Sequence, residues 1–197
     1  MDAFPQLRPF YSVEEYLHRE ELSDTKHEYY RGDIFAMAGG SIDHNRIAGN
    51  VFAALSEGLR GGPCEAFTGD MRLLVERHTL YCYPDAMVIC GEPAFAPGRR
   101  DVVTNPTLIL EVLSPSTKIY DRGEKFNFYR SIPTFQEYLL VDQSRVYAEQ
   151  WQRQENGSWL LSEFDRLDQE IAFPSIGITI PVYRLYERVA WLATTNQ

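Results

Sequence analysis

Short apolar runs separated by turn residues fill most of the chain, and a few longer stretches repeat their apolar positions at helical spacing. The clearest strand pattern runs from Thr107 to Leu113, an apolar run with an Asn-Pro dipeptide before it and a Ser-Pro dipeptide after it. Such a run is typical of a central strand covered on both faces. The clearest helical pattern runs from about Ile42 to Arg60, where Ala48, Val51 and Leu55 line one face.

Turn signals and periodicity divide the rest of the chain into further helices and strands. Helices are predicted over Val13–Leu22 behind a Ser12/Glu15 capping box, over Tyr120–Ser131, and as a single last helix that begins at Pro181. Strands are predicted over His27–Tyr30, Ile34–Met37, Cys64–Thr68, Met71–Glu76, Leu80–Cys90, Phe135–Val141, Arg145–Arg153, Trp159–Ser162 and short runs between Ile171 and Ile180. These elements predict one α/β domain over residues 1–197, with a mixed β-sheet flanked by helices and additional antiparallel strands.

Glu111 interrupts the most apolar strand of the chain. An ionised carboxylate in such a place costs several kcal/mol unless a cation, a metal or hydrogen-bond donors meet it. Asp85 is the second candidate, because it follows Tyr83-Pro84 within the predicted Leu80–Cys90 strand, where proline predicts an irregular sheet. Asp85 and Glu111 would suit one hard cation. Without Glu111, Asp85 would be better interpreted as a turn residue after proline.

Lys125 is the third candidate, on the helix that follows the Glu111 strand. It stands at helical spacing from Asp121 and Phe128. The alternative is a surface lysine paired with Asp121 at i, i+4. His44 lies at the head of the apolar face of the Ile42–Arg60 helix, where a histidine is more often a core residue than a ligand or base. Asp121 and His44 are therefore secondary candidates.

The first hairpin offers a further pair of acidic residues, Glu28 and Asp33. Either residue could contribute an acidic group to the same site. Charges on an exposed strand explain both residues as well.

Four segments in a fixed order resemble a known protein family. They are Tyr83-Pro84-Asp85, Leu110–Thr117, Asp121–Lys125 and Tyr138–Asp142. Together they resemble a bacterial restriction endonuclease family, formerly a domain of unknown function, within the PD-(D/E)XK nuclease superfamily. The resemblance covers roughly residues 11–182 and implies a restriction-endonuclease-like fold and DNA hydrolysis.

The resemblance also implies roles for particular residues. Asp85, Glu111 and Lys125 would be catalytic, although Leu113 stands where the superfamily pattern has its lysine. The resemblance implies that this lysine has moved to the following helix, as Lys125. Asp85, Glu111 and the Val112 carbonyl form an oxygen set that Mg²⁺ or Mn²⁺ prefers. We expect DNA as the substrate, a homodimer that cuts both strands, and no organic cofactor.

Other functions remain compatible with these residues. Leu113 gives weight to a catalytically inactive protein of the same fold that binds DNA or a protein partner. Paired carboxylates also suit a glycosidase, whose acid and base need a defined separation. A serine nucleophile has no GxSxG motif, and the histidines lack metal-ligand spacing.

Charge and cysteine content narrow the expected setting. The net charge is −9, so DNA binding would need a local basic patch, and the candidates are Arg99, Arg100, Lys118, Arg122, Lys125 and Arg130. Three cysteines without CxxC spacing argue against a disulfide framework and a zinc site. No apolar run reaches the roughly 18 residues of a membrane span, and no signal peptide is visible. We expect a cytoplasmic protein.

Overall fold

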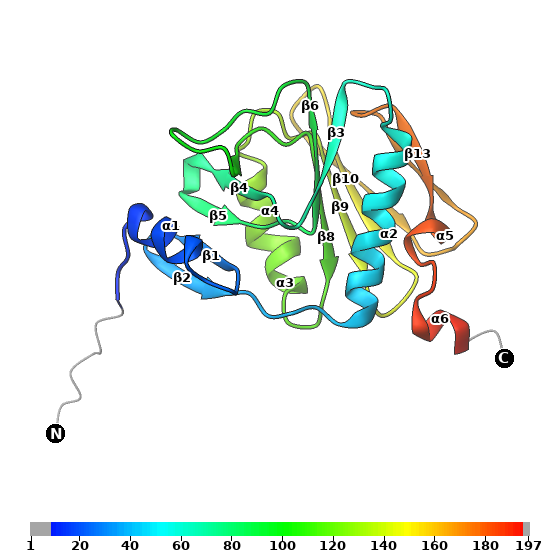
Figure 1. Cartoon of the computed structure of the whole chain (residues 1–197). Coiled ribbons are helices and arrows are strands. Elements are labelled where there is room, and N and C mark those ends of the chain that lie inside the picture. The colour runs from blue at the N-terminus through cyan, green and yellow to red at the C-terminus, as the bar shows by residue number, and fades with distance from the viewer. Residues whose placement is uncertain (1–8, 195–197) are drawn as a thin grey trace.

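A six-stranded mixed sheet forms the centre of the computed structural model, which describes residues 9–194 (Figure 1). Its strand order is β11-β10-β9-β8-β6-β3. The strands are β3 Cys64–Thr68, β6 Ala86–Cys90, β8 Leu108–Leu113, β9 Glu137–Asp142, β10 Ala148–Arg153 and β11 Trp159–Phe164. β8 and β9 are parallel and the other neighbours antiparallel. The predicted α/β fold with a mixed sheet is confirmed.

A second, five-stranded sheet lies beside the first, in the order β2-β1-β5-β4-β7. Its strands are β1 His27–Tyr30, β2 Asp33–Ala36, β4 Arg72–Val75, β5 Leu80–Cys82 and β7 Val102–Val103, with a 3₁₀ turn over Glu76–His78 after β4. The predicted Leu80–Cys90 strand is thus divided into β5 and β6. The break falls at Tyr83-Pro84-Asp85, because proline cannot donate to a strand ladder.

One face of the six-stranded sheet is covered by α2, Ile42–Gly58, and by a C-terminal layer (Figure 1). Ser41 caps α2 by accepting a hydrogen bond from the His44 backbone N–H, at 3.1 Å. The shared apolar cluster includes Ile47, Val51 and Leu55 of α2 with Leu108, Leu110 and Val112 of β8. The C-terminal layer contains the paired strands β12 Glu170–Phe173 and β13 Ile178–Pro181. This packing places the head of α2 beside the carboxyl end of β8.

The opposite face of the six-stranded sheet packs against the five-stranded sheet and the helix after β8. Ile109 and Leu113 of β8 belong to this second cluster together with Leu73, Leu80, Phe126, Tyr129, Tyr138 and Leu140. That helix consists of α3 Lys118–Tyr120, a π-helical turn Asp121–Lys125 and α4 Phe126–Tyr129. It begins two residues before the predicted start, and periodicity did not predict its wider turn.

The outer face of the five-stranded sheet carries α1, Val13–Glu21, which has the predicted capping box. In that box Ser12 Oγ accepts a hydrogen bond from the Glu15 backbone N–H, and Glu15 accepts one from Ser12. Tyr16 of α1 is fully buried against Tyr29 and Tyr81 of the sheet. None of the helices in residues 9–194 is both long enough and apolar enough to cross a membrane.

The prediction of one last helix after Pro181 was wrong. Two short helices occupy this region, α5 Val182–Leu185 and α6 Ala190–Thr194. Arg188 between them has φ 61, a left-handed conformation that cannot continue a right-handed helix. The apolar residues of this segment are therefore divided between two short helices, one before Arg188 and one after it.

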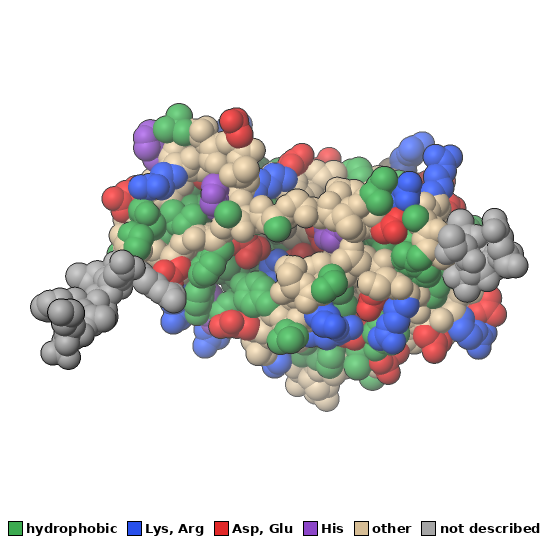
Figure 2. Space-filling model, turned by 90° about the horizontal axis from the view of Figure 1, so that it is seen from below, with side chains coloured by type: hydrophobic (Ala, Val, Ile, Leu, Met, Phe, Trp, Pro, Cys, Tyr) green, Lys and Arg blue, Asp and Glu red, His purple; other side chains and the backbone are tan. Residues whose placement is uncertain are grey.

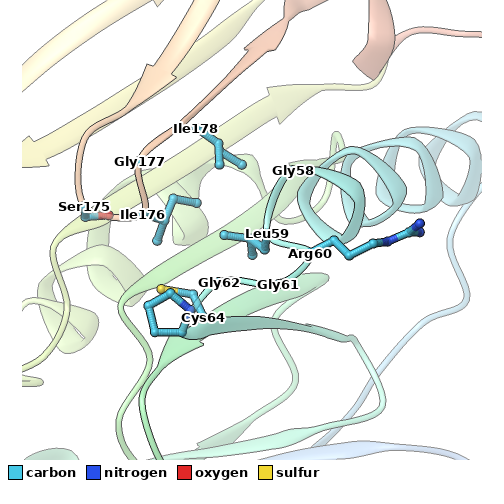
Figure 3. A pocket seen from close by; sticks show the side chains of 11 residues that line it. Gly58, Leu59, Arg60, Gly61, Gly62, Cys64, Ser175, Ile176, Gly177 and Ile178 are labelled. Carbon is cyan, nitrogen blue, oxygen red and sulfur yellow. The ribbon is translucent and has the colours of Figure 1, made fainter.

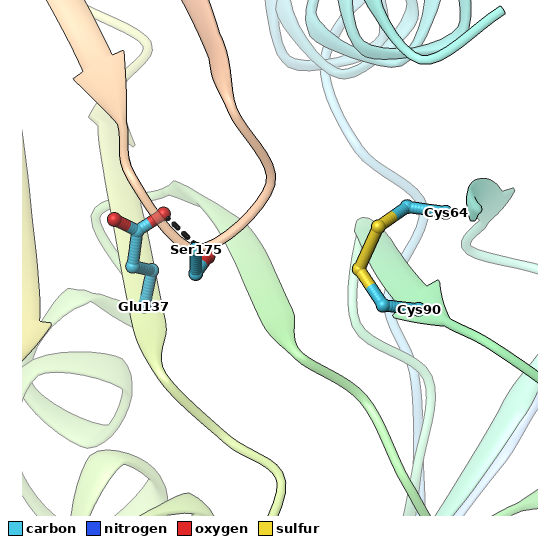
Figure 4. Close-up of a disulfide and its surroundings, with 4 residues drawn as sticks. All are labelled: Cys64, Cys90, Glu137 and Ser175. Atoms are coloured by element: carbon cyan, nitrogen blue, oxygen red, sulfur yellow. Dashed lines mark hydrogen bonds between the residues drawn. A yellow bond between two sulfur atoms is a disulfide. The ribbon is translucent and has the colours of Figure 1, made fainter. Parts of the chain in front are cut away.

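The prediction that the cysteines form no disulfide was also wrong. Cys64 and Cys90 are joined, with Cα atoms 3.9 Å apart (Figure 4). They stand opposite each other because β3 and β6 pair in a register that matches Cys64 with Cys90. The positions of the cysteines in the sequence do not predict this pairing. Cys82 is a free, buried thiol.

Candidate active site

Asp85 lies where β6 and β8 separate. The last residues paired between these strands are Ala86 and Leu110. Beyond this pair, the Val112 N–H of β8 has a side chain as its acceptor in place of a strand carbonyl. It donates to Asp85 Oδ2 at 2.7 Å. The break in the sheet after Pro84 thus directs one carboxylate at the peptide that follows Glu111. The turn interpretation of Asp85 does not account for this contact.

Glu111 is 5% exposed and is met by a cation and a hydroxyl. Lys125 Nζ lies 2.8 Å from its Oε1, and Tyr129 O–H donates to the same oxygen at 2.8 Å. Burial raises the pKa of Glu111 to about 8, with Asp121 and Asp85 adding to the rise and Lys125 opposing it. The expectation that a buried carboxylate in this strand has partners is confirmed.

Lys125 is 5% exposed, so it is not the surface lysine of the alternative interpretation. Its Nζ lies 3.2 Å from Glu28 Oε1 and 3.8 Å from Asp121 Oδ1, in addition to Glu111. Burial opposes its charge, but the surrounding carboxylates, first Glu111 and then Glu28, outweigh burial and raise its pKa. Three carboxylates from three elements therefore converge on one ammonium group.

The π-helical turn carries both Asp121 and Lys125 into this cluster. Asp121 is 3% exposed, and burial raises its pKa. Tyr138 O–H donates to the Asp121 backbone carbonyl at 3.1 Å, which ties the turn to β9. In a π-helical turn the backbone hydrogen bonds join residues i and i+5 instead of i and i+4. Single turns of this kind inside α-helices are frequent at functional sites.

His44, from the head of α2, reaches the other carboxylate of the site. Its Nε2 lies 3.4 Å from Asp85 Oδ2. The contact with Asp85 is the main cause of a raised pKa for His44, and the Val112 backbone adds to it, while burial opposes the rise. His44 is therefore a site residue by position and not a residue of the apolar α2 face.

The cluster contains more carboxyl groups than basic groups. Four carboxylates, those of Glu28, Asp85, Glu111 and Asp121, face Lys125 and the His44 imidazole. Seen from below, acidic, basic and histidine side chains gather among apolar ones in the middle of this face (Figure 2). Within residues 9–194, no three His, Cys, Asp or Glu side chains are grouped so as to hold a metal ion by themselves. A cation here would use fewer side chains, together with backbone oxygen and water.

The six candidate basic residues do not form one patch. Arg99 pairs with Glu21 and Asp101, and Arg122 pairs with Glu149. Lys125 is inside the acidic cluster. Lys118, Arg100 and Arg130 are exposed. Half of the six candidate basic residues are therefore held in ion pairs within the fold, and the other half are exposed.

Two members of the site received little or no weight from the sequence. Tyr129 was not predicted, although it stands four residues after Lys125, a spacing that places both side chains on one helix face. Glu28 was considered only as one of two acidic hairpin residues. Its side chain is 15% exposed and contacts Lys125, whereas Asp33 at the other strand of the hairpin has no such contact among the ion pairs of the described residues.

The clearest cavities of the described residues lie away from this site. One, of about 390 Å³, is lined by the Gly58–Cys64 turn and by Ser175–Ile178 (Figure 3). A second, of about 550 Å³, is lined by the same turn together with Phe52 and Gly91. Both adjoin Cys64 of the disulfide, at the end of the sheet opposite Asp85. The acidic cluster does not line either cavity.

The fold is a nuclease-like mixed α/β fold, and sequence comparison supplies the family. Residues 13–182 match the family model Uma2, described as "Putative restriction endonuclease". This match spans most of the chain, so the chain belongs to that family.

Relatives agree with the family assignment. The chain is 43% identical over 159 residues to the uncharacterized protein sll1609 of Synechocystis sp., covering 81% of this chain and 90% of that protein. It is 37% identical over 188 residues to the uncharacterized protein slr1290 of the same organism, covering 95% of each. A crystal structure described as a putative nuclease belonging to DUF820 from Anabaena variabilis superposes with a TM-score of 0.71 at 16% identity, covering 89% of this chain and 97% of that one. That likeness shows the fold.

Proposed function

We propose that this protein is a metal-dependent DNA endonuclease that hydrolyses phosphodiester bonds at the Asp85, Glu111 and Lys125 cluster. The main support is the convergence of four buried or half-buried carboxylates on one lysine and one histidine. Such a concentration of carboxyl groups is costly in a protein interior unless some of them are protonated or a further cation offsets them. Membership of the restriction endonuclease family supports a nucleic-acid substrate.

The donor set fits a hard divalent cation. Asp85 accepts a hydrogen bond from the backbone N–H of Val112, the residue that follows Glu111, and the Val112 carbonyl is a third oxygen. Mg²⁺ is bound through one or two carboxylates and keeps several waters, so two side chains and one carbonyl are sufficient. Mg²⁺ or Mn²⁺ held there would polarise a phosphodiester oxygen and lower the pKa of an attacking water.

Lys125 would act on the reacting phosphate. Its Nζ lies 2.8 Å from Glu111 Oε1, so it stands beside any group that Glu111 helps to hold. There Lys125 would orient the attacking water and offset charge on the pentavalent phosphate. Tyr129 keeps Glu111 in position by donating to the same oxygen. One P–O bond forms to water, another breaks, and the departing oxygen takes up a proton.

A second candidate function is supported by Leu113 and by the ion pair itself. Leu113 is buried in the core, and Lys125 already neutralises Glu111. A protein that binds DNA or a protein partner without cleaving would retain both features as structure. The two candidates differ in metal binding and in turnover.

Cleavage of supercoiled plasmid in Mg²⁺ or Mn²⁺ tests the proposal. We expect metal-dependent nicking by the wild type and a fall of roughly 100-fold or more in folded Asp85→Ala and Lys125→Ala variants, because each removes a group that acts on the transition state. Arg166→Ala is the matched control, since Arg166 pairs with Asp168 at an exposed position.

Isothermal titration with Mg²⁺ separates the two candidates when cleavage is weak. Metal binding that is lost in Asp85→Ala supports the enzyme. A folded wild type that neither binds metal nor nicks plasmid would exclude it and leave the binding protein.

A further inference from the structure

Two exposed apolar side chains stand at the free edge of the five-stranded sheet. Phe35 of β2 is 51% exposed, and Met37, the first residue after β2, is 36% exposed. β2 is an edge strand with β1 as its neighbour. We call this pair the apolar lip. Single exposed apolar residues are normal on a protein surface, so the significance of the lip depends on where it faces.

The strand register places the lip on the same face of the hairpin as the acidic cluster. Phe35 is paired with Glu28, and directly opposed residues of an antiparallel pair project from one face. Glu28 reaches Lys125 Nζ at 3.2 Å. Met37 continues the same face two residues on, because its N–H donates to the Lys26 carbonyl at 2.9 Å. The lip is therefore an outward extension of the site.

Charge offers little affinity for phosphate beside this lip. Lys26, on the same face, is paired with Asp70 and donates to the Gly69 carbonyl at 2.8 Å. Arg122 is held by Glu149. The chain as a whole carries a net charge of −9. Lys118, on the helix after β8, is exposed, so few basic side chains are open to the phosphates of a nucleic acid there, and other contacts would add to its affinity.

We propose that Phe35, with Met37 beside it, stacks on an unpaired nucleobase next to the scissile phosphate. The proposal deepens and rests on the proposed function of the same site. Aromatic stacking is tolerant of base identity and independent of phosphate charge. Bases inside a duplex present only their edges, because their faces are stacked on each other. The favoured substrate class is therefore DNA with unpaired bases, such as single strands, flaps or bubbles.

Fluorescence anisotropy with labelled oligonucleotides tests this assignment. We would compare a single-stranded oligothymidine with a blunt duplex of equal length, in Ca²⁺ to limit cleavage. We expect the wild type to prefer the single strand and Phe35→Ala to lose affinity for it on the order of ten-fold. Phe35→Tyr keeps the ring and should retain wild-type affinity.

Tyr183→Ala is the matched control. Tyr183 is 50% exposed and belongs to α5, on the other side of α2 from the hairpin (Figure 1). This variant should bind both oligonucleotides as the wild type does. Circular dichroism of each variant confirms that it is folded before binding is compared.

Several results would overturn the proposal. These are equal affinity of Phe35→Ala and wild type, equal losses in Phe35→Ala and Tyr183→Ala, or preference for the blunt duplex. Analytical ultracentrifugation adds a further one: if Phe35→Ala converts a dimer to a monomer without changing DNA affinity, the lip is a contact between two copies of the chain. Binding through Phe35 without plasmid cleavage would instead contradict the proposed function and leave the lip intact.

Discussion

Two buried carboxylates in neighbouring strands of one sheet have different surroundings. Glu111 in β8 is met by Lys125 and Tyr129 and is flanked by Asp85, Asp121 and Glu28. Glu137, at the start of β9, is 3% exposed. It accepts a hydrogen bond from Ser175 Oγ at 2.9 Å (Figure 4). A second comes from Gln152 Nε2 at 3.4 Å. Burial raises the pKa of Glu137 to about 7.

The difference lies in the partners and not in burial. Neutral donors are enough to satisfy Glu137, and that arrangement is complete within the fold. Glu111 sits instead among other acids that share one lysine. A raised pKa alone therefore does not distinguish the two carboxylates, because both groups have one. Convergence of several charged groups on one point distinguishes the β8 site.

The largest expected effect comes from removing the shared cation. Lys125→Met leaves Glu111, Glu28 and Asp121 without their ammonium partner, and breaking a buried charge group in this way costs about 3–5 kcal/mol. Urea unfolding measures the loss in the free energy of unfolding. Added Mg²⁺ should restore part of it if the cluster accepts a cation.

Lys26→Met is the control for this experiment. Lys26 pairs with Asp70 at the surface, with side chains 42% and 84% exposed, and exposed pairs contribute about 1 kcal/mol or less. Equal losses in the two variants would remove the distinction between the buried cluster and an ordinary ion pair.

Glu111 and Glu137 should each contribute separately to the pH dependence of the free energy of unfolding. Each has a folded pKa above its ordinary value of 4.5, so its contribution is fully present below pH 4.5 and is lost as pH rises through about 8 for Glu111 and about 7 for Glu137. Glu111→Gln should remove roughly 3–4 kcal/mol of this fall between pH 4.5 and 8. Chemical unfolding at a series of pH values measures it.

Mg²⁺ sharpens the same experiment. A cation beside Glu111 favours its ionised form, so Mg²⁺ should flatten the pH dependence that remains in Glu137→Gln. It should leave the dependence that remains in Glu111→Gln unchanged. If Mg²⁺ instead flattened the pH dependence of Glu111→Gln and left that of Glu137→Gln unchanged, the cation would lie beside Glu137, which contradicts the proposed site.

The smallest expected effect concerns the disulfide, which lies with Glu137 at the other end of the sheet. Reduction of Cys64–Cys90, which are 26 residues apart in sequence, should lower the free energy of unfolding by about 2–4 kcal/mol by freeing the unfolded chain. Plasmid cleavage should not change. Cys82→Ala in the reduced protein controls for the free thiol. A loss of cleavage on reduction would contradict this prediction, because it would show that the disulfide end of the sheet affects the candidate active site.

The local elements were largely predictable from residue pattern. The capping box at Ser12, the hairpin around Arg31-Gly32 and the apolar strand that contains Glu111 each depend on residues close in sequence. The break at Pro84 follows from the missing N–H of proline in the same way. These features also located Asp85, Glu111 and Lys125 as candidates.

The contacts between candidates could not be read from the chain. The pairing of Cys64 with Cys90, the reach of Glu28 to Lys125 and the contact of His44 with Asp85 each join segments whose separation is set by strand order and helix packing. The left-handed Arg188 that divides the predicted last helix was not predicted either. The amino-acid sequence specified which side chains carry charge into an apolar core. Their assembly around one ammonium group depended on the fold, because burial and strand register are properties of the packed whole.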